Sequence, residues 1–457
     1  TMYKKILIAS LALIAGLASC KKDDPTPSPN PPSTLTIDGV ASTLEFYQLD
    51  TAHLSVAGVA KDAAAKAVWA VNGAKAAEGA TFDFTTAHTG KYEVTLTVDG
   101  KSAKHTYTVA PRFSEGAFLL NEGNFGNETG SLTYIHPSKK LVIDQAYYRV
   151  NGTKLGNVCQ DLAFEGGKIY ILSQLGPKNG GEGLLTIANS HSLEKVKVYN
   201  DEALAQSTPT HIAVLRDHIY IRTERDGILR GSSEGGFTPI TGTKKALKQR
   251  MAQIGERLFA LTSDSKVLMI QGTQVVRELN LSPAKPSGIA VSHDGKLWVS
   301  TTNPNAILKV DPTPDNFIAL DTHVLDKSIS ATGPESWQRT TSSAFFAHGD
   351  KLYFTGQSSV IYCHDFATNK TSQVIDVKTI DGVGTSANMY YNSLGVDPST
   401  GELYYAAFEG YSTYNKKNVT MVLKADGTKL LLKEQVNSFP AGFFFIPNAA
   451  SRTGANR

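Results

Sequence analysis

The stretch Gly116-Ala117-Phe118-Leu119-Leu120-Asn121-Glu122-Gly123-Asn124-Phe125-Gly126-Asn127 reads as a short apolar strand that ends in a loop rich in glycine and asparagine. Its central feature, an aromatic residue inside a β-type run that follows a turn, recurs along the chain. The recurring aromatic residues are Phe118, Tyr170, Tyr220, Phe259, Trp298, Tyr353 and Tyr404. They stand between 39 and 55 residues apart. Repeats of this length built from short strands are typical of β-propellers, so the sequence predicts an all-β fold with seven blades.

Each repeat reads as four short strands joined by tight turns. In the second repeat the expected strands are residues 162–165, 168–172, 183–187 and 195–199. The turn between the first two strands is Gly166-Gly167, and the corresponding turns of the later repeats also contain glycine or aspartate. Two-residue hairpins require residues that accept positive φ, so this composition supports the strand assignment.

The two ends of the repeat array complement each other. The first repeat has no strand before Phe118, whereas the last one, residues 391–437, already has four and is followed by one more apolar segment. We expect residues 440–447 to supply the missing strand, which would remove the open edges of a linear array. The predicted blades are 117–150 with 440–447, 158–199, 208–240, 250–281, 286–326, 342–377 and 391–437.

The first residues read as an export signal. Lys4 and Lys5 precede an apolar run from Ile6 to Leu17, which is too short for a permanent membrane-spanning helix. The run ends in Leu17-Ala18-Ser19-Cys20, which is similar to a bacterial lipobox. This pattern predicts a signal peptide over residues 1–20 and a lipid anchor on Cys20. The alternative is an ordinary secretory signal with a chance cysteine.

The segment after Cys20 predicts a stalk. Residues 21–24 are two lysines and two aspartates, which resemble the surface-export signal of Bacteroidetes lipoproteins; the alternative is a solvated charge cluster. Residues 25–32 are rich in proline, which favours extended polyproline geometry. We therefore expect residues 21–33 to hold the folded part away from the membrane.

Residues 34–110 predict a small β-sandwich, with alternating patterns around Trp69 and over residues 91–98. Trp69 followed by Gly90-Lys91-Tyr92 resembles the core tryptophan and tyrosine corner of immunoglobulin-like domains, and more closely a polycystic-kidney-disease-type (PKD-like) repeat. The segment lacks a cluster of titratable residues, so we expect a spacer. The propeller would then occupy residues 111–449, with a tail over residues 450–457.

A ligand-binding surface is expected on one face of the propeller. The loops between second and third strands and the connections between repeats open on the same face, and here both sets contain long members. They carry aromatic side chains interleaved with amides, which suits a large amphipathic ligand. The predicted ligand-binding residues are Asn121, Glu122, Asn124, Phe125, Trp337, Gln338, Arg339, Tyr390, Tyr391, Asn392, Tyr411 and Tyr414. The alternative is that several of these aromatic residues fill the central channel or pack between blades.

Bulk properties and motifs give little support to other functions. The chain of 457 residues has a formal net charge of +3, which is no footprint for nucleic acid. Its histidines lack metal-ligand spacing, no Gly-x-Ser-x-Gly elbow occurs, and Asp311–Asp315 reads as a turn rather than a calcium loop. Cys159 and Cys363 are expected to be small core residues. We therefore predict no enzyme activity, no catalytic residue, no bound metal and no cofactor.

The phrase Leu119-Leu120-Asn121-Glu122-Gly123-Asn124-Phe125-Gly126, followed by Gly130–Tyr134, resembles a Bacteroidetes family of YncE-like (DUF5074) propeller lipoproteins. The resemblance covers residues 118–447. The best understood members, of the BtuG type, are surface lipoproteins that bind cobalamin over a TonB-dependent vitamin B12 transporter. The resemblance thus implies a protein anchored in the outer membrane and facing the cell exterior, with a corrinoid as ligand and such a transporter as partner.

Two other functions stay open at this point. The same face could serve a surface adhesion or scaffold module that binds glycan or protein, and the fold also occurs in hydrolases and lactonases. The N-terminal sandwich departs from a bare propeller.

Overall fold

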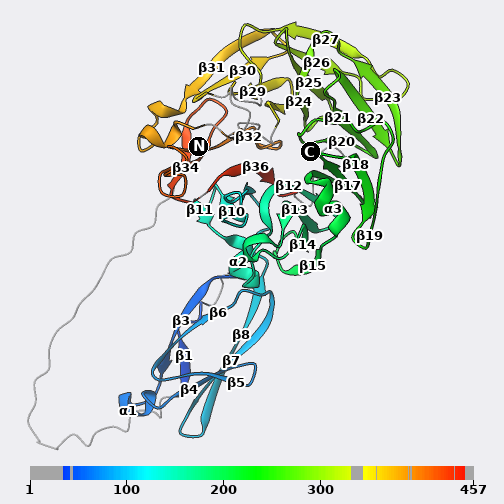
Figure 1. The fold of residues 1–457 in the computed structure, drawn as a ribbon. Coiled ribbons are helices and arrows are strands. Elements are labelled where there is room, and N and C mark those ends of the chain that lie inside the picture. Colours follow the sequence, from blue (N-terminus) through cyan, green and yellow to red (C-terminus); the bar gives the residue numbers. More distant parts are fainter. Residues whose placement is uncertain are drawn as a thin grey trace, which may run out of the picture. The chain divides into compact units, whose positions relative to one another are not determined.

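A computed structural model describes residues 34–41, 45–330, 343–356, 358–389, 391, 394–436 and 438–447. The chain divides into two compact units (Figure 1). The smaller unit consists of Thr1–Ala41, His53–Asp83 and Glu93–Thr106, and the larger one of Ser42–Ala52, Phe84–Tyr92 and Tyr107–Arg457. Strands dominate the described residues, which confirms the prediction of an all-β protein.

Two sheets form before residue 111. The first contains β1 (Thr36–Asp38), β3 (Thr51–Ala57) and β6 (Thr81–Thr85), in that order. The second has the order β2 (Phe46–Tyr47), β8 (Lys101–Ala110), β7 (Gly90–Val98), β4 (Val68–Val71) and β5 (Ala74–Glu78). A short helix, α1 (Lys61–Ala64), precedes β4. Trp69 of β4 is fully buried and its Nε1 donates to the carbonyl oxygen of Gly79 at 2.9 Å, so its expected core position is confirmed.

Seven four-stranded antiparallel sheets follow in the described part of the larger unit. The first combines β11 (Leu141–Ile143), β10 (Ser131–His136), β9 (Ala117–Asn121) and β36 (Pro440–Phe445). The next three are β12 (Asn157–Glu165), β13 (Lys168–Gly176), β14 (Leu185–Asn189), β15 (Lys195–Tyr199); β16 (Pro209–Leu215), β17 (His218–Thr223), β18 (Gly227–Ser232), β19 (Gly235–Pro239); and β20 (Ala252–Ile254), β21 (Arg257–Leu261), β22 (Lys266–Gln271), β23 (Gln274–Asn280).

The last three sheets repeat the same order. They are β24 (Lys285–Val291), β25 (Leu297–Thr302), β26 (Ala306–Val310), β27 (Ala319–Val324); β28 (Phe345–His348), β29 (Lys351–Phe354), β30 (Val360–Asp365), β31 (Lys370–Asp376); and β32 (Leu394–Val396), β33 (Leu403–Phe408), β34 (Asn418–Leu423), β35 (Lys429–Glu434). Short helices lie in the connections: α2 (Ala146–Asn151), η1 (Lys178–Gly180), α3 (Glu202–Ser207), η2 (Val377–Thr379) and η3 (Gly384–Ala387).

The last strand of the chain belongs to the first of these sheets. β36 pairs antiparallel with β9, with Phe443 opposite Leu119 and Phe444 opposite Phe118. This is the partner that the sequence predicted for residues 440–447. β36 also contacts β32 of the last sheet and β12 of the second, and Figure 1 shows the sheets grouped around a common centre.

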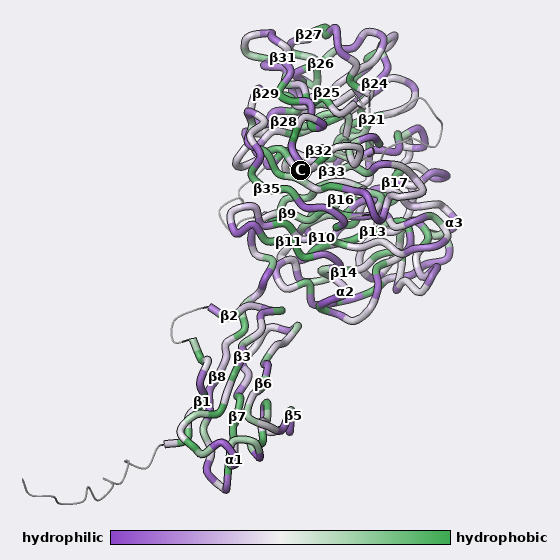
Figure 2. Tube along the Cα trace, turned by 90° about the vertical axis from the view of Figure 1, so that its left-hand side faces the viewer, coloured by the Kyte–Doolittle hydropathy of each residue, from purple (hydrophilic) through white to green (hydrophobic). Residues whose placement is uncertain are grey.

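The recurring aromatic residues lie in the second strand of each sheet. All seven residues are buried, with at most 7% of the residue surface exposed, so the prediction that they form core is confirmed. Figure 2 shows hydrophobic stretches within many strands and hydrophilic stretches at many connections.

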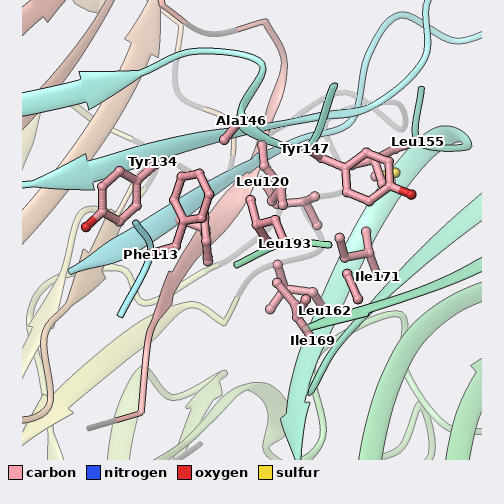
Figure 3. Close-up of a cluster of buried hydrophobic side chains, with 14 of the residues drawn as sticks. Phe113, Leu120, Tyr134, Ala146, Tyr147, Leu155, Leu162, Ile169, Ile171 and Leu193 are labelled. Carbon is pink, nitrogen blue, oxygen red and sulfur yellow. The ribbon is translucent and has the colours of Figure 1, made fainter. Parts of the chain in front are cut away.

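The first and second sheets share one hydrophobic cluster (Figure 3). It joins Leu120 of β9 and Tyr134 of β10 to Leu162 of β12 and Ile169 of β13. Phe113 also belongs to this cluster. Its ring lies 5.0 Å from the Tyr134 ring in an edge-on arrangement, which aromatic pairs prefer. Apolar packing between these two sheets therefore contributes to holding the neighbouring repeats together.

The pairing of β36 should be essential for stability. Phe443 is 2% exposed and its ring lies 5.5 Å from that of Tyr404 in the last sheet. We expect Phe443→Ala to lower the free energy of unfolding by about 3–5 kcal/mol, because it leaves a cavity between the first and last sheets. The measurement is the denaturation midpoint in guanidinium chloride. Leu320→Ala, on the edge strand β27 and 53% exposed, is the matched control and should change stability by less than about 0.5 kcal/mol. Equal effects of the two substitutions would contradict the role of β36.

Candidate ligand-binding site

The loop after β9 is held in a tight conformation by hydrogen bonds to two other parts of the chain. Glu122 donates its backbone N–H to Phe439 O at 2.7 Å, and its carbonyl oxygen accepts from Cys159 N at 3.2 Å. Asn157 of β12 donates to the carbonyl oxygens of Asn124 and Glu128. The loop is therefore anchored to the second sheet and to the segment that leads into β36.

Gly123 is required for this conformation. Its φ is 79°, in the region that favours glycine, and a Cβ there would stand 2.4 Å from the carbonyl oxygen of Thr129. The glycine thus turns the chain directly after Glu122 and lets the two arms of the loop approach each other.

The Glu122 side chain is the most distinctive polar group of this loop. It is 7% exposed, and both of its carboxylate oxygens accept from the Tyr391 hydroxyl, at 3.1 and 3.2 Å. Gln160 of β12 donates a further hydrogen bond, and Lys248 attracts the carboxylate. Residues from four separate parts of the chain thus meet around one carboxyl group.

Burial raises the pKa of Glu122 to about 7, although Lys248, Tyr391 and Gln160 each favour the ionised form. Burial and the neighbouring carboxylate in turn raise the pKa of the Tyr391 hydroxyl, which stays a hydrogen-bond donor. Glu122 therefore changes charge near neutral pH, in a position that a ligand could influence.

An aromatic cluster lies beside the same loop. The Tyr414 ring stacks on that of Phe439 at 4.3 Å, and the rings of Tyr411 and Phe408 lie 5.5 and 5.3 Å from Phe439. The Tyr414 hydroxyl donates to Glu128 Oε2 at 2.9 Å and accepts from Asn124 Nδ2 at 3.4 Å. Tyr411 is 42% exposed, so the cluster presents aromatic surface to solvent.

The structure therefore brings together several of the predicted residues. Asn124 contacts Tyr414 directly, Glu122 contacts Tyr391, and Tyr411 joins Tyr414 through Phe439. Asn124 and Tyr414 are 290 residues apart in the sequence, and their loops thus build one surface. We name this surface the loop-face cluster. Its members are Glu122, Asn124, Glu128, Gln160, Lys248, Tyr391, Phe408, Tyr411, Tyr414 and Phe439.

Two of the predicted residues have different surroundings. Phe125 is 67% exposed, and its ring lies 5.7 Å from the Lys178 ammonium. Asn121 is fully buried and donates from Nδ2 to Ser131 Oγ and Thr133 Oγ1, at 3.2 and 3.1 Å. Phe125 is accessible to a ligand, whereas Asn121 is buried at the end of β9 and its side chain joins β9 to β10.

The remaining predictions lie outside the described residues. These are Trp337, Gln338, Arg339, Tyr390 and Asn392 on the long connections, and the lipidation site Cys20.

The predicted ligand-binding residues did not include six residues of the cluster and its supports: Asn157, Gln160, Lys248, Glu128, Phe408 and Phe439. The first three are isolated polar residues near the start of inner strands, where no local pattern marks them. Phe439 had a visible feature, since it directly precedes the apolar strand β36, but its contact with Tyr414 depends on the pairing of β36 with β9.

The described residues do not meet the requirements of a metal site or of a membrane-spanning helix. They contain no group of three or more histidine, cysteine, aspartate or glutamate side chains placed to hold a metal ion. Cys159 and Cys363 are buried free thiols, as expected. Within the same ranges, no helix has both the length and the apolar character needed to cross a membrane.

Comparisons with known proteins agree with the fold. A family model described as a domain of unknown function (DUF5074) matches residues 115–446. A solved quinoprotein alcohol dehydrogenase-like protein from Bacteroides thetaiotaomicron has a TM-score of 0.56 and 15% identity, covering 90% of this chain and 98% of the other. At that identity the similarity shows the fold alone.

Two further structures are similar at lower scores. BamB from Moraxella catarrhalis has a TM-score of 0.36 and 11% identity, covering 60% of this chain and 76% of its own. The WD40 β-propeller domain of Doa1 has a TM-score of 0.40 and 9% identity, covering 70% and 87%. A search of curated proteins found no match.

The raised pKa of Glu122 predicts a pH dependence of stability. A carboxyl whose pKa is 4.5 when unfolded and about 7 when folded binds its proton more tightly in the folded state. This group therefore favours folding most below pH 4.5, and its contribution falls by about 3 kcal/mol as the pH rises to 7. Glu122→Gln should remove that fall.

The measurement is denaturant unfolding between pH 5 and pH 8, for the wild type and Glu122→Gln. Glu434→Gln, an exposed carboxyl on β35, is the matched control and should retain the wild-type slope. Parallel pH profiles of wild type and Glu122→Gln would show that Glu122 does not titrate as described.

Proposed function

Because the chain belongs to the DUF5074 family, we propose that it is a binding protein of that family which captures a large amphipathic ligand on the loop-face cluster. In this proposal the seven four-stranded sheets are the blades of one propeller, joined through β36, and the two N-terminal sheets are an immunoglobulin- or PKD-like spacer. The protein acts by binding and carries out no reaction.

The contact between the first and last blades carries this proposal. Asn124, from the loop after β9, bonds to Tyr414, from the loop after β33, at 3.4 Å. These two loops therefore form one continuous surface instead of separate projections. Its exposed aromatic ring, Tyr411, lies near a carboxyl group and a tyrosine hydroxyl that are already ordered. Ordering before binding lowers the entropic cost of holding a ligand.

The chemistry of the surface fits a corrinoid of the vitamin B12 type. Such a molecule combines a broad, partly apolar ring system with amide side chains around its edge. Tyr411 and Phe125 offer aromatic area, while Asn124 and Glu122 offer an amide and a carboxyl group for hydrogen bonds. The ligand is captured by shape and hydrogen bonding, without redox chemistry at cobalt.

The proposed setting is the outer surface of the outer membrane. The lipobox-like segment ending in Cys20 would supply the anchor, and the proline-rich residues 25–32 would hold the propeller away from the lipid. A TonB-dependent transporter is the proposed partner that receives the ligand.

A spectral titration tests the proposal. We expect purified protein to bind cobalamin or cobinamide with a dissociation constant in the micromolar range or below. Tyr411→Ala should weaken binding by about tenfold, because one aromatic contact is worth about 1.4 kcal/mol. Val324→Ala, which removes an exposed apolar side chain from β27, should leave the affinity unchanged.

Two outcomes would contradict the proposal. The absence of binding of either corrinoid at micromolar concentration would exclude this ligand class and leave the surface to a glycan or protein partner. Unchanged affinity in Tyr411→Ala, together with a measurable titration in the wild type, would show that binding uses other loops.

A further inference from the structure

A cavity lies at the strand ends remote from the loop-face cluster. It has a volume of ≈ 710 Å³ and is lined by inner-strand residues and by turns such as 397–400 and 136–138. These turns join first to second strands, or third to outer strands, and so lie at the strand ends remote from the long loops. Glu122, Tyr391, Tyr411 and Tyr414 are absent from its lining. The cavity is therefore distinct from the loop-face cluster.

Arg250 lies at the inner end of this cavity. Its side chain is 17% exposed, and its guanidinium lies 4.0 Å from the centre of the Phe444 ring. Its Nε is 3.6 Å from Asp161 Oδ1, beyond hydrogen-bond distance, and one terminal nitrogen donates a long bond of 3.5 Å to Phe443 O. Among the described protein atoms, Nε and the other terminal nitrogen of Arg250 have no hydrogen-bond acceptor.

A guanidinium in this state is well suited to receive a ligand. Burying N–H donors without acceptors is costly, so an oxygen placed at the inner end of the cavity gains more than it would in water. The Arg250 fork can donate two parallel hydrogen bonds to one such oxygen or to two adjacent ones.

The walls between Arg250 and the mouth are mainly apolar. Leu162, Ile212, Ile289, Val396 and Phe346 line the cavity from five different sheets. A volume of ≈ 710 Å³ falls in the range of pockets that hold molecules of drug-like size. The body of the ligand is therefore an apolar group of about two fused rings or more.

The charges around the cavity limit the ligand further. Glu115, Asp397 and Glu402 line the mouth, and Asp161 stands beside the single arginine at the inner end. Carboxylates thus outnumber the guanidinium, and low-dielectric walls strengthen their field. This excess of negative charge opposes an anion, although Arg250 alone would attract one.

We propose that this cavity binds an uncharged, elongated apolar molecule that carries a carbonyl or amide oxygen at one end, with that oxygen accepting from Arg250. The site is independent of the proposed corrinoid capture and faces the other way. It gives the protein a second small-molecule specificity, for neutral amphipathic compounds.

The probe for this site is prodan, an uncharged dimethylaminonaphthalene with a propionyl group, whose fluorescence shifts to the blue in apolar surroundings. Its matched anion is the corresponding dimethylaminonaphthalene carboxylate, which has the same ring system. Titrated with the full chain, prodan should show saturable, blue-shifted emission with a dissociation constant on the order of tenfold below that of the carboxylate or lower.

Three variants locate the binding. Ala290→Trp places a large ring in the cavity from a half-buried position on β24 and should weaken prodan binding by about tenfold or more. Arg250→Met should weaken prodan binding and keep or increase the preference over the carboxylate, because it removes the cationic side chain that the cavity lining offers to an anion. Tyr411→Ala, on the loop-face cluster, should change nothing. Far-ultraviolet circular dichroism checks that each variant is folded, and Ala290→Trp keeps the test decisive if Arg250→Met does not fold.

Several outcomes would overturn the inference. They are the absence of saturable prodan binding, equal affinity for the carboxylate, unchanged binding in Ala290→Trp, or loss of binding in Tyr411→Ala. None of these depends on whether the protein binds corrinoids, so the two proposals fail separately.

Discussion

The pairing of β36 with β9 is the constraint on which the rest of the larger unit depends. It joins segments about three hundred residues apart, so the chain loses a large conformational entropy when the two meet. Apolar burial must offset that loss, and Phe443, packed on Tyr404 of the last sheet, contributes to it. The same closure brings Phe439 beside the loop after β9, where its carbonyl oxygen accepts from Glu122 N. Sheet closure and the loop-face cluster are therefore consequences of one event.

Most of the strands could be predicted because their determinants are local. A turn containing glycine or aspartate followed by an aromatic β-type run marks the second strand of each sheet, and all seven of these aromatic residues are core. The partner of β9 followed from counting: one repeat lacked a strand and one apolar segment was left over. This prediction does not need contact distances, because an unpaired apolar strand leaves backbone N–H and C=O groups exposed, and pairing with the incomplete repeat satisfies them.

The candidate site was only partly predictable, because its geometry is set by contacts between sheets. Composition alone predicted that Asn124, Tyr411 and Tyr414 share one face, and the structure brings them into one group of contacts. Composition could not show that Asn121, one residue before the buried Glu122, bonds inward to Ser131 and Thr133. Arg250 follows Lys244, Lys245 and Lys248 in the sequence, and its place at the inner end of a cavity arises only from the convergence of the inner strands.

Two short segments connect the loop-face cluster to the cavity behind it. On β12, Gln160 bonds to Glu122, while the next residue, Asp161, lies beside Arg250. Before β20, Lys248 acts on Glu122, and Arg250, two residues later, lines the cavity. Each segment thus supplies one polar side chain to the loop-face cluster and one to the cavity. Gln160 and Lys248 act on Glu122, and their near neighbours in sequence, Asp161 and Arg250, form the charged pair in the cavity. A substitution in these segments removes a partner of one buried charge and lies within two residues of a partner of the other. The two surfaces are therefore separated most cleanly through residues outside these segments, such as Tyr411 on the loop face and Ala290 in the cavity.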